Sequence, residues 1–504
     1  MDANNTEVVL GGPGSGKTHT LIGRVEEALS AKVLPSRIGF FSFTKKAAEE
    51  AKSRACHKFG LAPDDLPHFR TFHSMAYKYL GTRRDQMMGW SNIKELGKML
   101  GMDFKGRMES ADDDVYGMAE ADRMLFLEGL ARNTKKPLKK VWEDAFEDSL
   151  DWRELERFAL TLQSYKKSRG LRDFNDLIEN FCLLDPRSLP KLDLMIVDEA
   201  QDNSPRQWDA MRLVASNAAQ VIVAGDDCQE IFSWSGSDSS QFTNMPGRQT
   251  TLEQSYRVPS SVHRLANSLT DRIINKRPRT WLPRQEVGTI NWYGNIDEID
   301  MSQGTWLLLA RNGYMLKEME EYCLEQGFSF NSVGSDPLKS PSLSAIRTWE
   351  SLRKGNSEPA DSVLDVFKLM ARASVPEGLL KVLKSTDPGK LVHMSELRQG
   401  GLGTSSPWYE CLIRISPRER DYFRAAWKRG EKLLSEPRIK ISTIHSAKGG
   451  EADNVVLITD MSYRCYENMN KGFEDEVKVW FVGVSRTRKT LNLIMPRTDL
   501  FFEL

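Results

Sequence analysis

Eight residues near the N-terminus have the types and spacing that hold the phosphates of a nucleotide. They fit the pattern Gly-x-x-x-x-Gly-Lys-Ser/Thr, and they are Gly11, Gly12, Pro13, Gly14, Ser15, Gly16, Lys17 and Thr18. The glycines let backbone N–H groups wrap the phosphates, and the start of the following helix adds a favourable dipole. Lys17 would reach the β- and γ-phosphates, and the Thr18 hydroxyl would bind Mg²⁺. The pattern therefore predicts a site for a nucleoside triphosphate with Mg²⁺.

Two acidic residues complete such a site. The apolar run Leu192–Val197 reads as a buried parallel strand, and Asp198 and Glu199 follow it directly. Carboxylates at the carboxyl end of such a strand lie beside the phosphate-binding crevice. We expect Asp198 to hold Mg²⁺ and Glu199 to orient or activate the attacking water. Without the phosphate loop, two acids after a strand would more often be a solvated strand end.

A third candidate strand, Gln220–Ala224, ends in a polar segment that contains Gln229. Gln229 is a candidate sensor of the γ-phosphate, and a polar loop residue is the alternative. The stretch Glu7–Leu10 reads as the strand before the phosphate loop, and Thr20–Ser30 reads as the helix after it. These elements predict one parallel α/β sheet with the site at its carboxyl edge.

Composition and charge exclude several classes of protein. The 504 residues contain 70 Lys plus Arg and 70 Asp plus Glu, which argues against charge-only binding of nucleic acid over the whole surface. The six cysteines form no Cys-x-x-Cys pair, so we expect reduced thiols in a cytoplasmic protein and no zinc or disulfide framework. No apolar run approaches the roughly 18 residues of a membrane span.

Ten segments, in order, resemble the superfamily 1 helicases of the UvrD/Rep/PcrA type. They are GGPGSGKT (11–18), FSFTKKAAEE (41–50), TFHS (71–74), DFNDLI (173–178), VDEAQD (197–202), AGDDCQEIFSWSG (224–236), LEQSYRVP (252–259), LLARN (308–312), STIHSAKGGEADNVVL (442–457) and VKVWFVGVSRTRKTL (477–491). The combination of VDEAQD, QEIFSW and HSAKG looks like the branch whose members move 3′→5′. The resemblance covers nearly the whole chain.

This resemblance implies an α/β fold with two RecA-like motor domains, each a parallel sheet flanked by helices and each with a mainly helical insertion. The first motor domain would comprise residues 1–80 and 190–249, with an insertion at 81–189. The second would comprise residues 250–334 and 438–504, with a reduced insertion at 335–437. Helical patterns support both insertions, at Asp151–Arg169 and at Ser362–Ala373.

The resemblance also assigns roles at the ATP site. Arg24 matches the adenine-side arginine, Tyr256 the aromatic that stacks on the base, and Glu451 the acid near the ribose. Arg257 and Arg486 match two arginines that touch the γ-phosphate from the second motor domain. The implied catalytic residues are therefore Lys17, Asp198, Glu199, Gln229, Arg257 and Arg486, with ATP and Mg²⁺ as cofactors.

A path for single-stranded DNA is implied by aromatic residues, because stacking tolerates any base. By resemblance Phe43 and Phe232 shape a base pocket and Trp234 stacks on a base. Phe72 is a further candidate, and ordinary core packing is the alternative for these rings.

Five polar residues would hold phosphates or couple the two sites: Thr44, Thr71, His73, Thr443 and His445. Structural roles are the alternative for the two histidines. Lysine-rich runs at 135–140 and 166–169 could flank DNA, although such runs more often form a solvated face.

The implied function is an ATP-dependent DNA helicase that moves 3′→5′ on single-stranded DNA and unwinds duplex. The alternative is a single-strand translocase that displaces proteins or remodels recombination intermediates with little unwinding. Its partners would be single-stranded and partly duplex DNA, and replication or recombination proteins. The chain departs from the family at its N-terminus, where ten residues precede Gly11 and no upstream glutamine motif is found.

Overall fold

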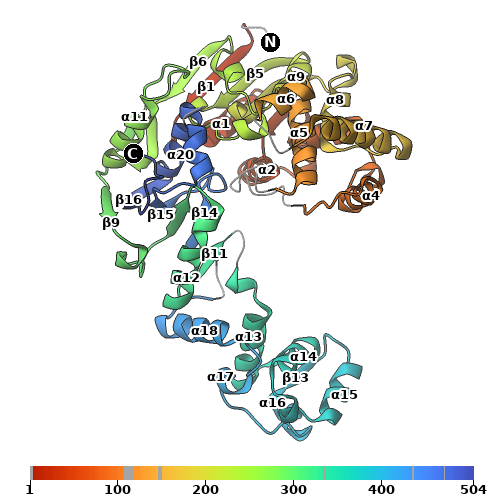
Figure 1. Cartoon of the computed structure of the whole chain (residues 1–504), viewed down its shortest axis with the longest axis vertical. Coiled ribbons are helices and arrows are strands. Elements are labelled where there is room, and N and C mark those ends of the chain that lie inside the picture. The colour runs from red at the N-terminus through yellow and green to blue at the C-terminus, as the bar shows by residue number, and fades with distance from the viewer. Residues whose placement is uncertain (1–3, 107–117, 146–149, 333–335, 434–435, 470–471) are drawn as a thin grey trace.

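Two parallel β-sheets form the centre of the molecule in this computed structural model (Figure 1). The structure describes residues 4–106, 118–145, 150–332, 336–433, 436–469 and 472–504. Within these ranges each large sheet has six strands, and two further pairs of short strands lie outside them. The mixed α/β class with parallel sheets flanked by helices is as predicted.

The first sheet has the strand order β3-β2-β4-β5-β1-β6, with every pair parallel. Its strands are β1 (Thr6–Gly11), β2 (Ile38–Ser42), β3 (His68–Arg70), β4 (Leu192–Asp198), β5 (Ala218–Gly225) and β6 (Arg248–Leu252). The strands predicted at Glu7–Leu10, Leu192–Val197 and Gln220–Ala224 are all present. They are apolar on both faces because helices cover both sides of the sheet.

Alternate side chains of the strands enter two cores. Val9 packs with helix α1 (Lys17–Ser30) and helix α2 (Lys45–Phe59), whereas Val8 and Leu10 pack on the other face. That other face is covered by α3 (Phe72–Tyr79), α8 (Phe174–Phe181), α9 (Pro205–Ala215) and α10 (Ser240–Thr243). Because both faces of the sheet are covered, polar residues that bind a ligand can lie only in the loops at the strand ends.

The described residues of the first predicted insertion are mainly helical. It contains α4 (Trp90–Leu100), α5 (Glu120–Thr134), α6 (Leu138–Asp144) and α7 (Trp152–Arg169), followed by α8. These helices share a core of their own around Phe158 and Leu162. Arg132 of α5 joins this core to α8 through ion pairs with Asp173 at 3.0 Å and Glu179 at 2.7 Å. The insertion is therefore anchored on the first sheet by buried charge as well as by packing.

The second sheet has the order β11-β14-β10-β15-β16-β9, and its pairs are also parallel. Its strands are β9 (Thr289–Tyr293), β10 (Trp306–Ala310), β11 (Phe330–Ser332), β14 (Ile439–Thr443), β15 (Ala452–Ile458) and β16 (Thr487–Ile494). The associated helices are α11 (Ser260–Thr270), α12 (Leu316–Gln326), α19 (Tyr463–Met469) and α20 (Phe473–Val484). Strands β7 (Gln254–Pro259) and β8 (Leu282–Arg284) form a separate parallel pair.

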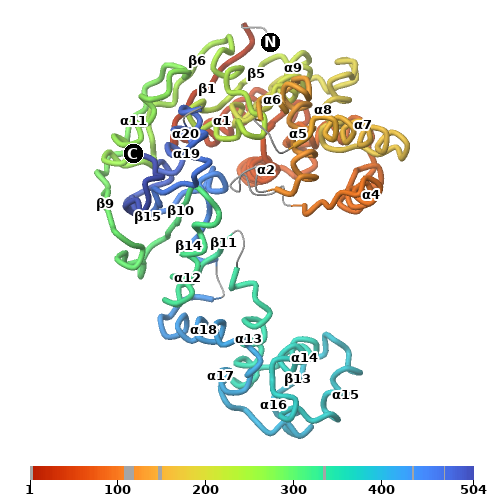
Figure 2. Tube along the Cα trace, in the orientation of Figure 1, coloured from red at the N-terminus to blue at the C-terminus, as the bar shows by residue number. Residues whose placement is uncertain are grey.

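An arm extends away from the second sheet (Figures 1 and 2). It contains α13 (Pro341–Arg353), β12 (Ser357–Pro359), α14 (Ala360–Leu369), α15 (Glu377–Ser385), β13 (Leu391–His393), α16 (Met394–Gln399), α17 (Trp408–Cys411) and α18 (Pro417–Arg429). The helix predicted over Ser362–Ala373 ends at Leu369, before an extended Met370. The predicted start of this insertion, Ser335, lies outside the described residues. None of the described helices is long and apolar enough to cross a membrane.

The chain leaves the first sheet slightly later than the predicted boundary between residues 249 and 250. Strand β6 continues to Leu252 and pairs with β1 along its whole length, from Glu7 opposite Arg248 to Gly11 opposite Leu252. The crossing to the second sheet therefore begins after Leu252, immediately before the β7 segment that carries Tyr256 and Arg257.

His68 is a buried histidine whose protonation we expect to weaken the fold. Burial, together with the charges of Lys78 and Arg70, lowers the pKa of His68 from 6.5 to about 4. Between these two values the unfolded chain binds the proton and the folded chain does not, so stability falls as pH falls. The loss amounts to about 3 kcal/mol at most, at about 1.4 kcal/mol per pKa unit.

We therefore expect the drop in Tm between pH 7 and pH 4.5 to be smaller in His68→Gln than in the wild type. Thermal melts at the two pH values measure this difference. His57→Gln, at an exposed position on α2, is the matched control and should melt like the wild type. An identical drop in wild type and His68→Gln would show that His68 is not a source of acid sensitivity.

Candidate nucleotide site

The phosphate loop joins β1 to α1 and has the backbone that its glycines allow. Gly14 and Gly16 have φ values of 72° and 78°, in the left-handed region that side chains disfavour. A Cβ at Gly12 would come within 2.7 Å of the Trp281 ring, so only glycine fits there. Lys17 Nζ donates a hydrogen bond to the Gly11 carbonyl at 2.9 Å. The backbone of the loop can therefore surround phosphate oxygens, and the Lys17 side chain lies back across the loop.

Asp198 is the last residue of β4, and it lies opposite Thr18, which is in the first turn of α1. The Thr18 hydroxyl donates to Asp198 Oδ2 at 3.2 Å. Burial and the adjacent Glu199 charge raise the pKa of Asp198 to about 7, and Lys17 opposes this. A hydroxyl and a carboxylate oxygen at this distance are ligands that suit Mg²⁺. These residues therefore fit the predicted metal, which would replace their direct hydrogen bond.

Glu199 occupies an unusual backbone position next to Asp198. Its φ of 54° and ψ of 43° are left-handed, which is rare for a residue with a side chain. Burial would raise the pKa of Glu199, but the charges of Lys17 and Lys448 together hold it below its usual value, at about 2. The carboxylate is therefore ionised at neutral pH.

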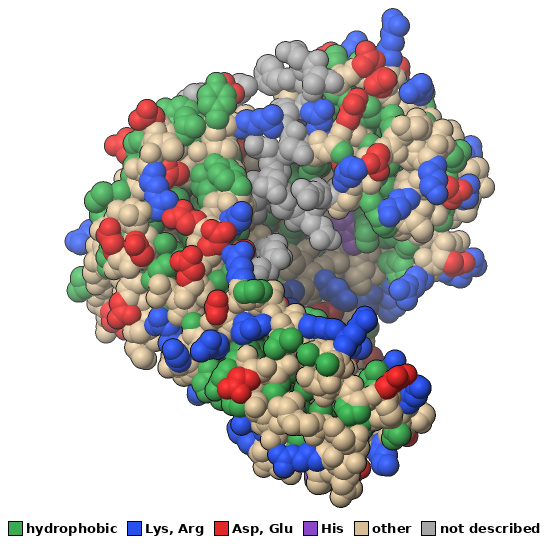
Figure 3. All heavy atoms as spheres, turned by 60° about the horizontal axis from the view of Figure 1, so that its bottom comes forward, with side chains coloured by type: hydrophobic (Ala, Val, Ile, Leu, Met, Phe, Trp, Pro, Cys, Tyr) green, Lys and Arg blue, Asp and Glu red, His purple; other side chains and the backbone are tan. Residues whose placement is uncertain are grey.

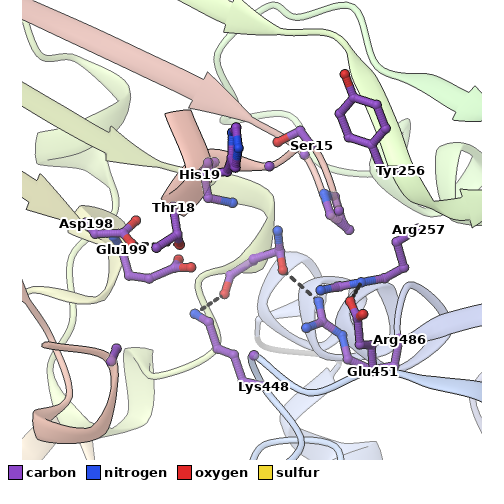
Figure 4. Close-up of a pocket in the computed structure, with 18 of the residues that line it drawn as sticks. Ser15, Thr18, His19, Asp198, Glu199, Tyr256, Arg257, Lys448, Glu451 and Arg486 are labelled. Atoms are coloured by element: carbon purple, nitrogen blue, oxygen red, sulfur yellow. Dashed lines mark hydrogen bonds and ion pairs between the residues drawn. The ribbon is translucent and has the colours of Figure 1, made fainter. Parts of the chain in front are cut away.

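The part of the chain that follows the first sheet contributes two arginines to the same pocket. Arg486 lies two residues after the end of α20 and is 1% exposed, and its Nη2 donates to Gln229 Oε1 at 2.7 Å. Burial and the nearby Arg257 charge lower the pKa of Arg486 to about 9. Arg257 on β7 binds Glu451 Oε2 at 2.5 Å, so Glu451 holds this arginine. Figure 4 shows Arg257, Arg486 and Glu451 together on the side of the pocket away from Asp198 and Glu199.

These groups line one cavity of about 520 Å³ between the two sheets. Every residue predicted for catalysis lines it, together with Thr18, Tyr256 and Glu451. Residues that sequence reasoning missed line it as well: His19, Ala47, Glu50, Arg54, Lys448, Gly449 and Arg488. His19 directly follows the phosphate loop, and Lys448 lies within the HSAKG segment, so their positions in these motifs were available signals.

The structure does not place Arg24 at this cavity. Its guanidinium binds Glu7 and Glu27, each at 3.0 Å, and the residue lines neither the main cavity nor the adjoining hollow beside Tyr256. Arg24 therefore does not line the cavity in this arrangement, and its contact with adenine stays a prediction. Glu7, a buried acid on β1, binds Arg24 instead. His19 lines both hollows instead.

Tyr256 stands at the edge of the cavity with 72% of its surface exposed. Its backbone N–H donates to the Gly14 carbonyl at 2.8 Å, and the neighbouring Ser255 hydroxyl donates to the Pro13 carbonyl at 2.8 Å. The β7 segment is thus fastened to the phosphate loop, and this places the Tyr256 ring near Gly16. An exposed ring next to the loop is suited to stacking on a nucleotide base.

The predicted DNA-binding aromatics divide into two groups. Phe43 and Phe232 stack on each other at 5.7 Å between ring centroids, and His445 lies 6.4 Å from Phe232. Trp234, by contrast, stacks on Phe126 of helix α5 at 6.0 Å. Its ring therefore faces the insertion, and a base would have to share or replace that contact.

Phe72 is not available to a base. It is 3% exposed and stacks on Phe41 at 4.8 Å inside the core of the first sheet. The core alternative is therefore the one that the structure supports, because a ring two residues after β3 turns back under the sheet. The prediction of Phe72 as a DNA contact is corrected accordingly.

The predicted phosphate contacts have structural duties that sequence reasoning did not assign. Thr44 and Thr71 are N-caps of α2 and α3, and their hydroxyls accept hydrogen bonds from Ala47 N at 3.2 Å and Ser74 N at 3.1 Å. The Thr443 hydroxyl accepts from Ser446 N at 3.3 Å. An N-cap leaves the first N–H groups of its helix near the surface, so a phosphate could bind beside it.

His73 lies within α3 rather than on a loop. Its ring meets Phe174 edge-on at 6.0 Å, and burial lowers the pKa of His73 to about 4, so the ring is neutral. Phe174 is 65% exposed, and sequence reasoning missed it. Together with Trp234 and Phe126 it lines a hollow of about 400 Å³ between the insertion and the first sheet.

The two lysine-rich runs are largely occupied within the protein. Lys135 binds Asp209 at 2.6 Å, Lys140 binds Asp144 at 2.8 Å, and Lys166 is buried against Asp176 at 2.8 Å. Other basic side chains gather around the recess between the arm and the region of the first sheet (Figure 3).

Comparison with known proteins places the chain among helicases. Residues 2–249 match the family described as "UvrD/REP helicase N-terminal domain", and residues 426–498 match "UvrD-like helicase C-terminal domain". The two matches together span more than half of the chain. They contain the phosphate loop, the acidic strand end and the segment that carries Arg486, but not β7, which carries Arg257.

Several named helicases are similar in sequence. The ATP-dependent DNA helicase PcrA of Staphylococcus epidermidis is 27% identical over 317 residues, which cover 59% of this chain and 42% of that protein. DNA helicase II of Salmonella typhimurium is 27% identical over 373 residues, covering 65% and 49% respectively. The ATP-dependent DNA helicase srs2 of Schizosaccharomyces pombe is 24% identical over 378 residues, covering 65% and 42%. The chain thus spans less than half the length of each of these relatives.

The positions of Tyr256 and Arg24 lead to opposite expectations for nucleotide affinity. Tyr256→Ala should weaken ATP binding, because stacking of a base on an aromatic ring contributes about 1–3 kcal/mol. This corresponds to roughly a 5- to 150-fold rise in Kd. Arg24→Ala should leave Kd unchanged. Titration with a fluorescent ATP analogue measures both variants, and an equal loss of affinity in Arg24→Ala would restore the adenine-side role of that arginine.

Proposed function

We propose that this chain, which belongs to the UvrD/Rep helicase family, hydrolyses ATP to move along single-stranded DNA and to unwind duplex. One observation carries the proposal. Glu199, directly after β4 of the first sheet, and two arginines that follow the crossing to the second sheet, Arg257 and Arg486, line the same cavity beside the phosphate loop. An ATPase built in this way is complete only when the two sheets are close together.

The chemistry assigned to this chain's residues follows from their positions. Backbone N–H groups of the phosphate loop and Lys17 bind the β- and γ-phosphates, and Thr18 with Asp198 would hold Mg²⁺, which supplies charge neutralisation when bound. Glu199 accepts the proton of the attacking water. Arg257 and Arg486 stabilise negative charge on the transferred phosphoryl group, a contribution of about 10³–10⁵ in rate for such arginines.

Lys448 links the cavity to the aromatic path. Its ammonium binds both carboxylate oxygens of Asp202, at 2.6 and 2.7 Å, and the Gln229 carbonyl at 2.5 Å. The same ammonium lies 5.1 Å from the Phe232 ring. A shift of the second sheet on ATP binding would therefore move Lys448 against both Gln229 and Phe232. Differential contacts of this kind are what convert nucleotide state into movement.

The aromatic path supports single-stranded DNA as the track. Phe43 and Phe232 stack beside His445 at the junction of the two sheets, and Phe174 is exposed close to Trp234. Stacking on such rings is sequence-tolerant, as a motor requires. We assign the 3′→5′ direction from the resemblance of the VDEAQD, QEIFSW and HSAKG segments to that branch of the family.

The test of ATPase function compares the wild type with Glu199→Gln, with and without single-stranded DNA. We expect DNA to stimulate hydrolysis in the wild type and the variant to lose at least about 100-fold in kcat, since a positioned base contributes about 10²–10⁴. Glu49→Gln on the exposed face of α2 is the matched carboxylate-to-amide control and should behave as wild type. A wild type that does not hydrolyse ATP would refute the motor.

Strand-displacement assays test direction and unwinding. Duplexes with a 3′ single-stranded tail should be unwound, and duplexes with only a 5′ tail should not. A preference for the 5′ tail would contradict the assigned direction. Removal of a tightly bound protein from a 3′-tailed strand, without strand separation, would instead support the translocase alternative.

A further inference from the structure

Gln201 lies two residues after Glu199, and the proposed chemistry has given it no role. Its side chain is fully buried. The amide Nε2 donates to Glu199 Oε2 at 2.6 Å, and the amide Oε1 accepts the backbone N–H of Asp226 at 3.1 Å. Both polar atoms of Gln201 are therefore used, one on the acid that accepts the proton and one on the loop after β5.

Asp226, on that loop, contacts residues of the part of the chain that follows the crossing, directly through Arg279 and indirectly through Gln229. Its Oδ2 accepts from Gln229 Nε2 at 2.7 Å, and Gln229 in turn accepts from Arg486 at 2.7 Å. Its Oδ1 forms an ion pair with Arg279, from the segment between α11 and β8. Asp226 is fully buried and the Arg279 side chain is only 8% exposed, so the pair is shielded from solvent. Arg279 lies outside all the motifs found in the sequence.

Together these contacts form one hydrogen-bonded chain, in which every link joins two side chains except the one from the backbone N–H of Asp226 to the Gln201 amide. It runs from Arg486 through Gln229, Asp226 and Gln201 to Glu199, with Arg279 as a second input at Asp226. Two of its members, Arg279 and Arg486, follow the crossing to the second sheet. The other four lie on loops of the first sheet, at the ends of β4 and β5.

The backbone conformation of Glu199 leaves the position of its side chain dependent on these hydrogen bonds. Because Glu199 is left-handed and precedes only a short helical turn, Ala200–Asp202, its side chain is not directed by a regular helix. The Gln201 amide is the side-chain partner that holds one carboxylate oxygen.

We propose that Gln201 is a positioning residue that makes the placement of Glu199 depend on the contacts of Arg279 and Arg486 with the loop after β5. This inference rests on the proposed ATPase function. When the second sheet is engaged, Asp226 is clamped, its N–H fixes the Gln201 amide, and the amide holds Glu199 toward the cavity. When it is not engaged, Asp226 and Gln201 are free to shift and the carboxylate is misplaced.

The experiment compares Gln201→Met with a matched glutamine variant, Gln207→Met. Methionine keeps the length of Gln201 but removes both hydrogen bonds. Gln207 lies on the same segment and accepts only the Ser204 N–H, at 2.8 Å, as part of the cap of α9. Measurements are the kcat and KM for ATP with saturating single-stranded DNA, the Kd of an ATP analogue, and Tm.

We expect Gln201→Met to lose about 10- to 100-fold in kcat, the scale for a slightly misplaced catalytic group. Its Kd for the ATP analogue should stay within about twofold of wild type, because the two hydrogen bonds of the Gln201 amide go to Glu199 and Asp226 and not to the phosphate loop. Gln207→Met should change Tm and leave kcat alone. The split between kcat and Kd separates positioning from a general loss of structure.

A double-variant cycle tests the link to the second sheet. Arg279→Lys keeps the charge beside Asp226 but not the geometry, and we expect it to lower kcat. If the two residues act through one chain, Arg279→Lys combined with Gln201→Met will be hardly worse than Gln201→Met alone. Multiplied losses would mean independent action and would overturn the link.

The remaining outcomes are also decisive. An active wild type with an equally active Gln201→Met would overturn the positioning role and leave the ATPase proposal standing. A parallel fall of kcat, nucleotide affinity and Tm in Gln201→Met would assign a purely structural role. An inactive wild type would overturn both proposals together.

Discussion

Three buried ion pairs between the two sheets are the interaction on which the rest of the structure depends. Asp202, Asp226 and Glu230 on loops of the first sheet pair with Lys448, Arg279 and Lys478 from the second-sheet side of the chain. Each acid is at most 3% exposed. A buried carboxylate without its partner is strongly destabilising. The loops that carry the catalytic groups can therefore be buried as they are only while the second sheet lies against them.

This constraint explains why the nucleotide cavity lies between the sheets rather than on one of them. Asp198 and Glu199, which we expect to bind the metal and the attacking water, lie at the end of β4. The positively charged side chains across the cavity come from β7, from the turn after β14 and from the end of α20. Pairing brings Lys448 to Asp202 and Arg486 to Gln229, and the cavity is what remains between them. Its two walls belong to different sheets, so any change in their separation alters phosphate binding and proton transfer together.

The aromatic path is built on the same junction. Phe232 follows the loop that carries Asp226 and Gln229, and it lies between Phe43 of the first sheet and His445 of the second. Phe126, on helix α5 of the insertion, stacks on the ring of Trp234, which follows Phe232 by two residues. The insertion therefore affects the aromatic path, because it determines which ring faces are open to a DNA strand. The arm is joined only to the second sheet and makes no such contact among the described residues.

The amino-acid sequence by itself determined the local parts of this protein. The phosphate loop, the buried strands with acids at their ends, and the helices at Thr20–Ser30 and Asp151–Arg169 were predictable, because each depends on residues a few positions apart. The tertiary structure alone decided which side chains meet across long separations. Glu7 removes Arg24 from the cavity, Phe126 covers Trp234, and Phe41 takes Phe72 into the core. It also brings Arg279, outside every motif, to Asp226, because a buried charge is stabilised by whichever opposite charge the fold places beside it.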